Sequence, residues 1–386
     1  MSKYLKLAVL AGIGGACFYA YKNKYITSMN DITSHVSKHK YKYLLGLIPV
    51  GLGLVFLKFL HGISKNIPFN KSPKADTLLK TDYFYKSYDA KPVILITGAN
   101  GGIGKEASKV LSSTNANVVM ACRNVTRSKP VLLEIMKETG NNNVELMTLD
   151  LSDFNSIDTF MDAFKAKYKR LDIIVCNAAV WPQKKGQKTK QGLEMAFGVN
   201  HIGHMKLVLG LKDLMTSTIK NFGVKNTKIV IVTAIPYTMD KYNKEFDIND
   251  LNKHELADAY FQSKMCNVMF TRQFAKLYPL NSDGTGILCV SLHPGVGRTN
   301  LLDDRDENGN PVNKYGVLRG IIFFIWADTV PQLAYTQCYL ALTDPSDLKH
   351  GGHYINKDIQ NVYGGVCDND NLCKQLWDKS LSIINQ

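Results

Sequence analysis

The hydrophobic residues of this chain follow two different patterns, one at the start and one from residue 91 onward. The start holds two apolar stretches, LAVLAGIGGACFYAY at 7–21 and YLLGLIPVGLGLVFL at 43–57. Each has about 15 uninterrupted apolar residues, short of the roughly 20 that span a bilayer core. Flanking tyrosines and lysines, whose polar ends reach the membrane interface, extend both stretches to spanning length. We therefore predict a two-helix membrane anchor over residues 1–63.

Two other interpretations of these stretches stay open, namely a cleaved signal peptide followed by one helix, and a helical hairpin packed on protein. The first stretch ends in ACFYAYK, which is a poor small-residue cleavage site. Pro49 in the second stretch fits a kinked membrane helix better than a soluble core helix. We expect membrane lipid as a partner, in either the mitochondrial inner membrane or the endoplasmic reticulum.

From residue 91 the pattern changes to short apolar runs that alternate with helical segments. The runs are VILIT, NVVMAC, DIIVCNAA, KIVIVT and GILCVSLHP. Between them, apolar residues recur with helical periodicity over about 12–20 residues. Strands that alternate with helices form a parallel sheet covered on both faces. We predict one doubly wound α/β domain over 91–386, preceded by a polar, lysine-dotted linker at 64–90.

The charge is concentrated beside the apolar stretches. The net charge is +14, and residues 1–92 carry 14 lysines, no arginine and four acidic residues. The other 294 residues carry 33 basic and 29 acidic side chains. A basic block next to apolar segments is typical of a membrane surface, so we expect no nucleic-acid partner.

The eight cysteines are scattered, and none belongs to a CxxC pair, so no metal site is expected. Most of them lie within apolar runs, which indicates buried thiols in a reducing compartment. A disulfide between Cys367 and Cys373 stays open as an alternative.

Residues 93–111, VILITGANGGIGKEASKVL, have the pattern of a strand, a glycine-rich turn and a helix. Gly98 permits the tight turn, Gly102 lets the backbone approach a pyrophosphate, and Gly104 lets helix and strand pack closely. The phosphates would lie at the helix N-terminus, where unpaired N–H groups and the dipole favour negative charge. A glycine triplet alone is weak evidence, but in this context it predicts a dinucleotide-binding, Rossmann-type fold.

Arg123 follows the second strand, in VVMACRN. It is the first arginine of the chain, and only seven of the 47 basic residues are arginine. A planar guanidinium suits a phosphate, whereas an NAD site usually places an acid at this position. We therefore predict NADP(H) as the cofactor, with a solvent-facing arginine as the alternative. The third strand ends in MTLDLSD, where Asp150, followed by Leu151, is placed to meet the adenine edge.

Several motifs in order make the chain resemble the short-chain dehydrogenase/reductase superfamily. More narrowly, it resembles the branch of retinol dehydrogenases, the WW-domain-containing oxidoreductase and light-dependent protochlorophyllide oxidoreductase. The motifs are TGANGGIG (97–104), MACRN (120–124), DIIVCNAAV (172–180), GLEMAFGVNHIGHMKL (192–207), AYFQSKMCNVMFTRQFAK (259–276) and SLHPGVGRTNL (291–301). The resemblance implies cofactor contacts from Gly98, Asn100, Gly102, Ile103, Gly104, Arg123, Asn124, Asp150, Leu151, Asn177, Ala178, Ala179, Tyr260, Lys264, Pro294, Gly295 and Thr299. Ala179 stands where the family has a glycine.

The resemblance also implies catalytic roles for Tyr260, Lys264 and Asn200. The tyrosine would exchange a proton with the substrate oxygen while hydride moves to or from the nicotinamide. A free tyrosine has a pKa of about 10, too high for efficient acid–base work at neutral pH. Lys264 lies one helical turn further on the same face, where its charge favours the tyrosinate. Asn200 is expected to link a water relay to that lysine.

One position departs from the family pattern, because IVIVTAIPY at 229–237 has no serine. Aligned on the strand, the family's catalytic serine falls at Ala234. Side chains alternate along a strand, so Thr233 should point away from the cofactor unless the strand end shifts by one residue. We keep Thr233 as a candidate catalytic residue, with Tyr237 and Thr238 as further candidate hydroxyls.

The leading hypothesis is a membrane-anchored, NADP(H)-dependent oxidoreductase that interconverts a lipophilic carbonyl and an alcohol, such as a retinoid-, sterol- or lipid-derived one. Without a substitute for the serine, the lost hydrogen-bond donor costs roughly 10²–10³ in rate. The alternative is a non-catalytic subunit of a membrane complex, for example in mitochondria, that retains the nucleotide site and contacts other subunits. The segment GIIFFIWA at 320–327 is compatible with a lipophilic pocket, a membrane contact or a core helix.

Overall fold

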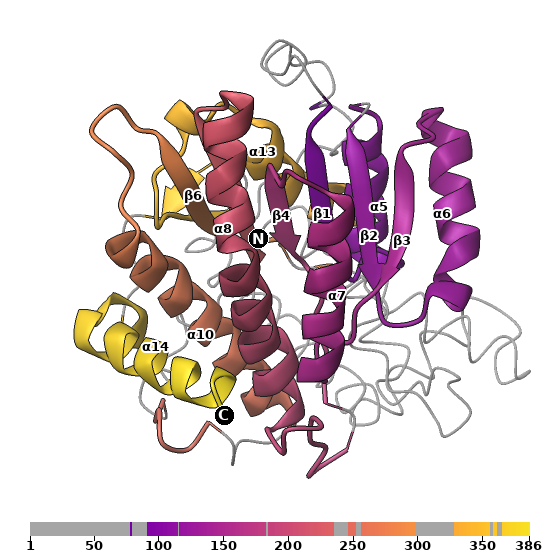
Figure 1. Ribbon diagram of the computed structural model, residues 1–386. Coiled ribbons are helices and arrows are strands. Elements are labelled where there is room, and N and C mark those ends of the chain that lie inside the picture. Colours follow the sequence, from indigo (N-terminus) through magenta and orange to yellow (C-terminus); the bar gives the residue numbers. More distant parts are fainter. Residues whose placement is uncertain are drawn as a thin grey trace, which may run out of the picture. The chain divides into compact units, whose positions relative to one another are not determined.

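The computed structural model describes residues 78, 91–114, 116–182, 184–234, 246–251, 256–295, 297, 328–355, 358–360 and 365–386. The predicted anchor lies outside the described residues, as does the predicted linker apart from Leu78. No helix within the described ranges is long and apolar enough to cross a membrane. Figure 1 shows the described part as a sheet with helices on both sides.

Eight strands of the described chain form one sheet in the order β3-β2-β1-β4-β5-β6-β7-β8. Neighbours from β3 to β7 are parallel, and β8 is antiparallel to β7. The strands are β1 (Val93–Thr97), β2 (Asn117–Cys122), β3 (Val144–Thr148), β4 (Ile173–Cys176), β5 (Asn226–Val232), β6 (Gly286–His293), β7 (His353–Ile355) and β8 (Asp358–Gln360). The five predicted apolar runs correspond to β1, β2, β4, β5 and β6, so the prediction of a parallel, Rossmann-like α/β sheet is confirmed.

Helices cover both faces of this sheet. They are α5 (Gly102–Ser112), α6 (Val125–Thr139), α7 (Phe154–Lys167), α8 (His204–Phe222), α10 (Leu256–Leu277), α12 (Val330–Leu333), α13 (Tyr335–Leu342) and α14 (Asp370–Ile384). Shorter turns are η2 (Phe197–Gly203), η5 (Pro345–Asp347) and η6 (Gly365–Asp368). Side chains of α5, α6 and α13 pack on one face, and those of α7, α8 and α10 pack on the other. The ribbon in Figure 1 shows helices on both sides of the sheet.

The helix α7 illustrates why these segments fold as they do. Ile157, Phe160, Met161 and Phe164 recur at spacings of three and four, and all four side chains are buried against the sheet. Asp153 caps the helix start by accepting a hydrogen bond from the N–H of Asn155 at 3.1 Å. An apolar stripe and a cap are thus both present in the sequence of this helix.

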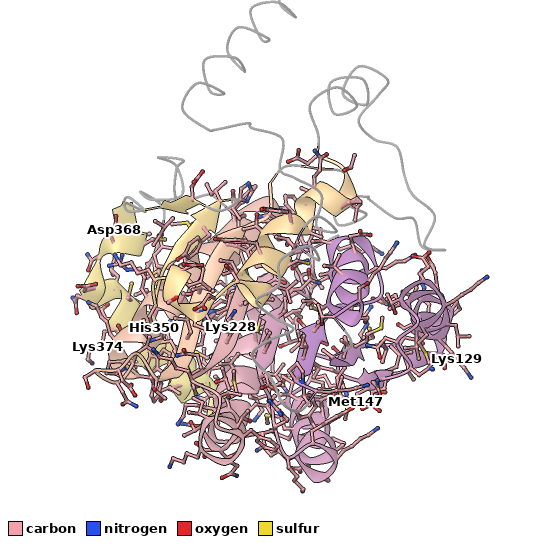
Figure 2. The ribbon with its side chains drawn as sticks, turned by 90° about the horizontal axis from the view of Figure 1, so that it is seen from above. Lys129, Met147, Lys228, His350, Asp368 and Lys374 are labelled. Carbon is pink, nitrogen blue, oxygen red and sulfur yellow. The ribbon has the colours of Figure 1, made fainter. Side chains whose placement is uncertain are left out.

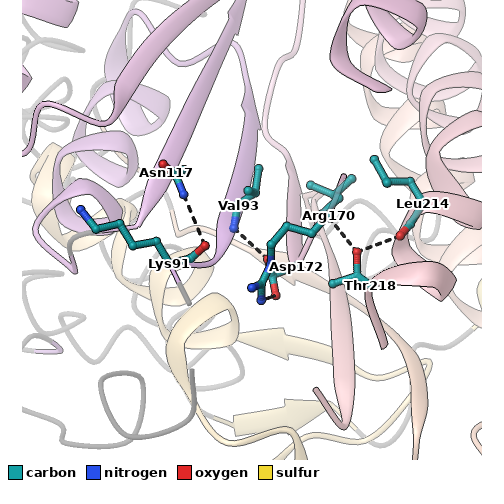
Figure 3. A network of polar contacts seen from close by, with 8 residues as sticks. Lys91, Val93, Asn117, Arg170, Asp172, Leu214 and Thr218 are labelled. Carbon is teal, nitrogen blue, oxygen red and sulfur yellow. Dashed lines mark hydrogen bonds and ion pairs between the residues drawn. The ribbon is translucent and has the colours of Figure 1, made fainter. Parts of the chain in front are cut away.

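A buried ion pair ties strands together at the amino-terminal end of the sheet (Figure 3). Arg170 donates to both carboxylate oxygens of Asp172, at 2.8 and 2.5 Å. Asp172 also accepts the N–H of Val93 at 2.7 Å, which joins the start of β1 to the start of β4. Next to this pair, Thr218 of α8 accepts the N–H of Leu171 at 2.8 Å.

A second buried charge, Lys228 of β5, joins the sheet to α13. Figure 2 shows Lys228 in the interior, whereas Lys129 and Lys374 lie at the periphery. Its ammonium donates to the carbonyls of Leu340 and Ala341, at 3.3 and 2.9 Å, and also to that of Thr343. Burial lowers the pKa of Lys228 to about 7. The lysine thus binds the carbonyl groups at the C-terminus of α13, the end of a helix that favours a cation.

The order of the strands reverses at β1 and β4, which makes this place a topological switch point. From β1 the chain moves outward to β2 and β3, and it then returns to form β4 on the other side of β1. Ligands bind at such a switch point, beside the carboxyl ends of the strands. Those ends are Thr97 and Cys176, and most of the predicted site residues follow them or the ends of neighbouring strands.

Candidate active site

The turn between β1 and α5 has a shape that fits a pyrophosphate. Gly98 has φ +64°, in the left-handed region that favours glycine. A Cβ on Gly104 would overlap the Gly98 carbonyl and the Asn177 side chain, which agrees with the packing reason predicted for this glycine. Gly101, at the N-cap of α5, has no side chain to bind the first N–H groups. A Cβ on Gly101 would meet nothing within 4 Å, so there is open space beside the N-cap of α5.

The chain that leaves β4 is bonded to the end of β1. Thr97 Oγ1 accepts the N–H groups of Asn177 and Ala178, at 3.0 and 2.9 Å. Asn177 Nδ2 donates to the carbonyls of Thr97 and Gly98, at 2.9 and 3.3 Å. Ala178 and Ala179 are half-buried. The structure therefore brings the predicted residues of the glycine turn and of the β4 motif together.

The residues after β2 are exposed and lie next to the glycine turn in the hydrogen-bond pattern. Arg123 and Asn124 are exposed, and Asn124 Oδ1 caps α6 by accepting the N–H of Arg127 at 2.9 Å. Asn100 Nδ2 donates to Ser128 Oγ at 2.8 Å, so the glycine turn is tied to the start of α6. The sequence prediction does not include Arg127. A second arginine, four residues after the first in a chain with only seven, is the signal that could have identified it.

The residues after β3 are held by local hydrogen bonds. Asp150 Oδ1 accepts from the N–H and the hydroxyl of Ser152, at 2.9 and 2.6 Å, and Ser156 Oγ accepts the N–H of Asp150. Leu151 is buried. In the first turn of α5, the carbonyl of Ile103 accepts from Gln337 of α13 at 3.1 Å. Each of these predicted cofactor residues thus has a fixed position at the carboxyl edge of the sheet.

Tyr260 and Lys264 lie one turn apart on α10. Lys264 is 1% exposed, its Nζ donates to the carbonyl of Val232 at 2.9 Å, and it lies 5.7 Å from the centre of the Tyr260 ring. Burial raises the pKa of Tyr260 and lowers that of Lys264 to about 8. A cation beside a phenol favours the tyrosinate, so the charged lysine opposes the effect of burial on the tyrosine. The pair has the geometry of a proton donor with an adjacent positive charge.

Two aromatic residues that the sequence prediction does not include enclose the phenol. The Trp181 and Tyr260 rings have centroids 4.8 Å apart at an angle of 40°. Phe261 meets both rings edge to face, at 5.8 Å from Trp181 and 5.5 Å from Tyr260. Trp181 directly follows the β4 motif, and the chain has only three tryptophans. This position could have identified Trp181 as a residue of the site.

Asn200 lies in the π-helical turn η2, which continues into α8. Its Oδ1 accepts the N–H of Val180 at 2.8 Å, and its Nδ2 donates to the Val180 carbonyl at 3.1 Å and to Ser263 Oγ at 3.0 Å. π-Helical turns occur frequently at functional sites. The side chain of Asn200 therefore clamps the chain that leaves β4 and fixes it beside α10.

Thr233 is bonded to the neighbouring strand. Its Oγ1 lies 2.9 Å from the carbonyl of Leu292 in β6 and 3.2 Å from that of Ala234, and the residue is 2% exposed. Because a hydroxyl has a single proton, this bond leaves none for a substrate oxygen, and the geometry does not support the candidate catalytic role. Ala234 is half-buried, and Tyr237 and Thr238 lie outside the described residues.

The loop after β6 is described only in part. Pro294 and Gly295 are half-buried, and Gly295 has φ +104°. A Cβ on Gly295 would lie 2.8 Å from a carboxylate oxygen of Asp328, the movable end of a side chain, so the positive φ is the reason that favours glycine there. Thr299 and the apolar segment 320–327 lie outside the described residues, and their predicted roles stay predictions.

The seven described cysteines are all free and buried. The alternative disulfide is not formed, because Cys373 Sγ lies 3.8 Å from the carbonyl oxygen of Cys367 in a weak hydrogen bond. Among the described residues, no group of histidine, cysteine and acidic side chains could hold a metal ion.

Comparison with known proteins agrees with this arrangement. The family described as short chain dehydrogenase matches residues 92–240. Retinol dehydrogenase 11 from Homo sapiens is 31% identical over 76% of this chain and 85% of its own length. Retinol dehydrogenase 12 from Homo sapiens is 33% identical over 88% of this chain and 98% of its own length.

The solved structures show the same fold. A short chain dehydrogenase from Escherichia coli CFT073, determined in complex with NADPH, superposes with a TM-score of 0.51. It is 18% identical, and the match covers 71% of this chain and 98% of that one. The glycine turn, the tyrosine–lysine pair and the retinol dehydrogenase relatives lead to one conclusion. The chain belongs to the short-chain dehydrogenase/reductase superfamily, in its retinol dehydrogenase-like branch.

Proposed function

We propose that this chain is an NADP(H)-dependent dehydrogenase/reductase that interconverts a lipophilic carbonyl compound and its alcohol. The observation that carries the proposal is the buried pair of Tyr260 and Lys264, with Nζ 5.7 Å from the ring centre. The pair lies at the same edge of the sheet as a glycine turn that fits a dinucleotide. The relatives named retinol dehydrogenase support a retinoid-, sterol- or lipid-derived substrate.

In the direction of reduction, Tyr260 donates its phenolic proton to the substrate oxygen and becomes a tyrosinate. Lys264, held by the carbonyl of Val232, stabilises that negative charge. The nicotinamide, when bound, supplies the hydride that the carbonyl carbon receives, and it accepts the hydride in the reverse direction. One proton and one hydride convert a carbonyl into an alcohol. Trp181 packs on the phenol, and this apolar neighbour strengthens the interaction between the two charged groups.

Alanine at position 234 slows this reaction without removing the proton donor. A serine hydroxyl at this position would hold the substrate oxygen through one preorganised hydrogen bond. Loss of one such donor costs roughly 10²–10³ in rate. We therefore expect slow turnover with an intact requirement for Tyr260.

NADP(H) is the proposed form of the cofactor because two exposed arginines follow β2. Arg123 and Arg127 are exposed and four residues apart, and we expect a 2′-phosphate to meet their guanidinium groups. We expect Arg123→Ser to raise the Kd for NADPH at least about tenfold, which corresponds to one lost charge-assisted contact. The Kd for NADH, which has no 2′-phosphate, should stay within a factor of two of its wild-type value.

We further propose that residues 1–63 anchor the chain in a membrane, with lipid as a partner, in the endoplasmic reticulum or the mitochondrial inner membrane. The lipophilic substrate class supports this location, because such substrates concentrate in bilayers. The alternative, a non-catalytic subunit of a membrane complex, is not favoured, because the relatives are named as dehydrogenases and the tyrosine–lysine pair is intact.

The proposed function is tested with the full chain, purified in a mild detergent and supplied with NADPH and a panel of hydrophobic aldehydes and ketones. We expect oxidation of NADPH with at least one of them, and reduction of NADP⁺ with the matching alcohol. Tyr260→Phe should lower kcat by about 10²–10⁴-fold, the usual contribution of a general acid. Tyr278→Phe, beyond the end of α10, is the control and should change little. Lack of turnover with every compound, or a Tyr260→Phe variant as active as the wild type, would contradict the proposal.

A further inference from the structure

The main chain at Trp181 is held on both sides. Val180, which precedes it, makes two hydrogen bonds with the Asn200 side chain, at 2.8 and 3.1 Å. Pro182, which follows it, is buried, and a proline ring fixes the φ angle of its own backbone. Trp181 thus projects from a stretch of chain whose neighbours on either side have fixed positions.

The indole of Trp181 is part of a cluster of three aromatic rings. Its ring centre lies 4.8 Å from that of Tyr260 at an angle of 40°, and Phe261 meets both rings edge to face. Each ring contacts the other two, so the side chain of Trp181 is held beside the phenol. Tyr260 is buried, whereas Trp181 and Phe261 are half-buried. The cluster therefore combines an enclosed phenol with aromatic surface that the protein does not fully cover.

A bound substrate has to place its carbon skeleton next to this cluster. Proton transfer from Tyr260 requires the substrate oxygen within about 2.6–3.2 Å of the phenolic oxygen. The groups bonded to the carbonyl carbon then lie beside the ring that packs on the phenol. Aromatic rings favour offset-stacked and edge-to-face neighbours. A flat aromatic group suits the indole in this respect, whereas a saturated ring is puckered and thicker and has no π face.

We propose that Trp181 is a specificity-determining residue, which selects compounds whose carbonyl group is attached to a flat aromatic ring over saturated ring compounds with the same carbon skeleton. The inference rests on the proposed function and narrows its lipophilic substrate class. The pair of Tyr260 and Lys264 acts on any carbonyl group that reaches it, so the selection comes from the surface beside the pair. Because the indole is held in place, a puckered ring stays farther from the phenol.

The first test compares 2-naphthylmethanol with decahydro-2-naphthylmethanol, which has the same skeleton in saturated form. Their Kd values are measured by titration calorimetry with the full wild-type chain in mild detergent and NADPH, as free concentrations. Alcohol and NADPH are both reduced, so no turnover occurs. Each affinity is divided by the water–alkane partition coefficient of the alcohol, which removes the difference in lipophilicity.

The ratio of these two corrected affinities is the aromatic preference. We expect the aromatic alcohol to be favoured about 2–10-fold, the range of one stacked pair. An aromatic preference of one or less, or binding of neither alcohol, would overturn the inference.

The second test removes the flat ring. Trp181→Leu keeps an apolar side chain, and we expect the aromatic preference to fall about 2–10-fold. Trp181→Phe keeps a flat ring and should retain most of the preference. The matched control is Phe222→Leu at the C-terminal end of α8, outside the cluster, which should leave the preference unchanged. An unchanged preference in Trp181→Leu, or an equal loss in Trp181→Phe, contradicts the inference.

Both tests measure binding, and the first needs no variant, so it stays decisive if Trp181→Leu does not fold. Lack of turnover with every carbonyl compound contradicts the proposed function and leaves the comparison of Kd values intact. A chain that turns over carbonyl compounds without an aromatic preference contradicts the inference alone.

Discussion

Burial acts in opposite directions on the two residues that carry the proposed chemistry. It raises the pKa of Tyr260, which makes the phenol a poor acid, and it lowers the pKa of Lys264, which makes the ammonium easier to deprotonate. Tyr260 depends on the positive charge of Lys264 to release its proton at neutral pH. The protonation state of Lys264 should therefore set the pH range in which the enzyme is active.

We expect kcat/KM for reduction to fall as the pH rises through about 8. Burial lowers the pKa of Lys264 to about 8, so the lysine is charged below that pH and neutral above it. Only the charged form stabilises the tyrosinate. The measurement is a pH profile of kcat/KM with saturating NADPH. Lys276→Gln, at a half-exposed lysine near the end of α10, should leave the profile unchanged, and a profile that is flat up to pH 10 would contradict the assignment.

Substitutions at the adjacent positions 233 and 234 should have different effects on kcat. Ala234→Ser supplies the donor that the family places here, and we expect kcat to rise by about 10²-fold with little change in the Kd of NADPH. Thr233→Val removes a hydroxyl that is bonded to the Leu292 carbonyl, so we expect some loss of stability and little change in kcat. Loss of all turnover in Thr233→Val would show instead that Thr233 supplies the missing hydroxyl.

At the scale of the elements, the sheet depends on polar pairs as well as on apolar contacts. Asp172→Ala leaves Arg170 buried without its carboxylate and leaves the N–H of Val93 without its acceptor. We expect the free energy of unfolding to fall by about 3–5 kcal/mol, as for other broken buried ion pairs. The change is measured as a lower denaturant midpoint of the full chain.

The matched control for this substitution is Asp213→Ala on α8. The Asp213 side chain is 94% exposed, and its ion pair with Lys212 lies at the surface. Exposed pairs contribute little to stability, so the midpoint should not move. Equal effects of Asp172→Ala and Asp213→Ala would show that the buried pair does not join β1 to β4.

The sequence predicts the elements of the sheet better than it predicts the contacts within the site. Buried parallel strands are almost continuously apolar. For this reason β1 and β2 can be located from their runs of apolar residues. The short strands β7 and β8 have three residues each and give no comparable signal. The π-turn around Asn200 cannot be predicted from periodicity. The main-chain carbonyl of Asn200 accepts hydrogen bonds from side chains of α8 and α10, and such contacts leave no periodic pattern in the sequence.

The same limit applies to the aromatic cover of the phenol. Motif and spacing identify Tyr260 and Lys264, because a helical turn brings residues four apart onto one face. Trp181 follows Val180, which Asn200 holds by two hydrogen bonds, and its contact with Tyr260 joins segments that are distant in the sequence. Contacts of this kind depend on the folded chain and have no local pattern.

At the scale of the whole molecule, the chain combines a nucleotide-binding domain with a basic, apolar N-terminal part. The described domain accounts for the proposed chemistry, and the uneven charge distribution accounts for the proposed location. A lipophilic substrate reaches the enzyme from a bilayer more readily than from water. Membrane attachment should therefore affect access to the substrate more than the chemical step.

We expect the full chain to remain with membranes after a carbonate wash and to require detergent for release. Leu10→Arg combined with Leu54→Arg places a charge in each apolar stretch, at about 2.5–3.5 kcal/mol per arginine at the centre of a membrane helix. The double variant should appear in the soluble fraction. Leu133→Arg, at a side chain 56% exposed on α6, is the control and should stay with membranes. A wild-type chain that is soluble without detergent would contradict the anchor, and a mature chain that lacks the first stretch would favour a signal peptide.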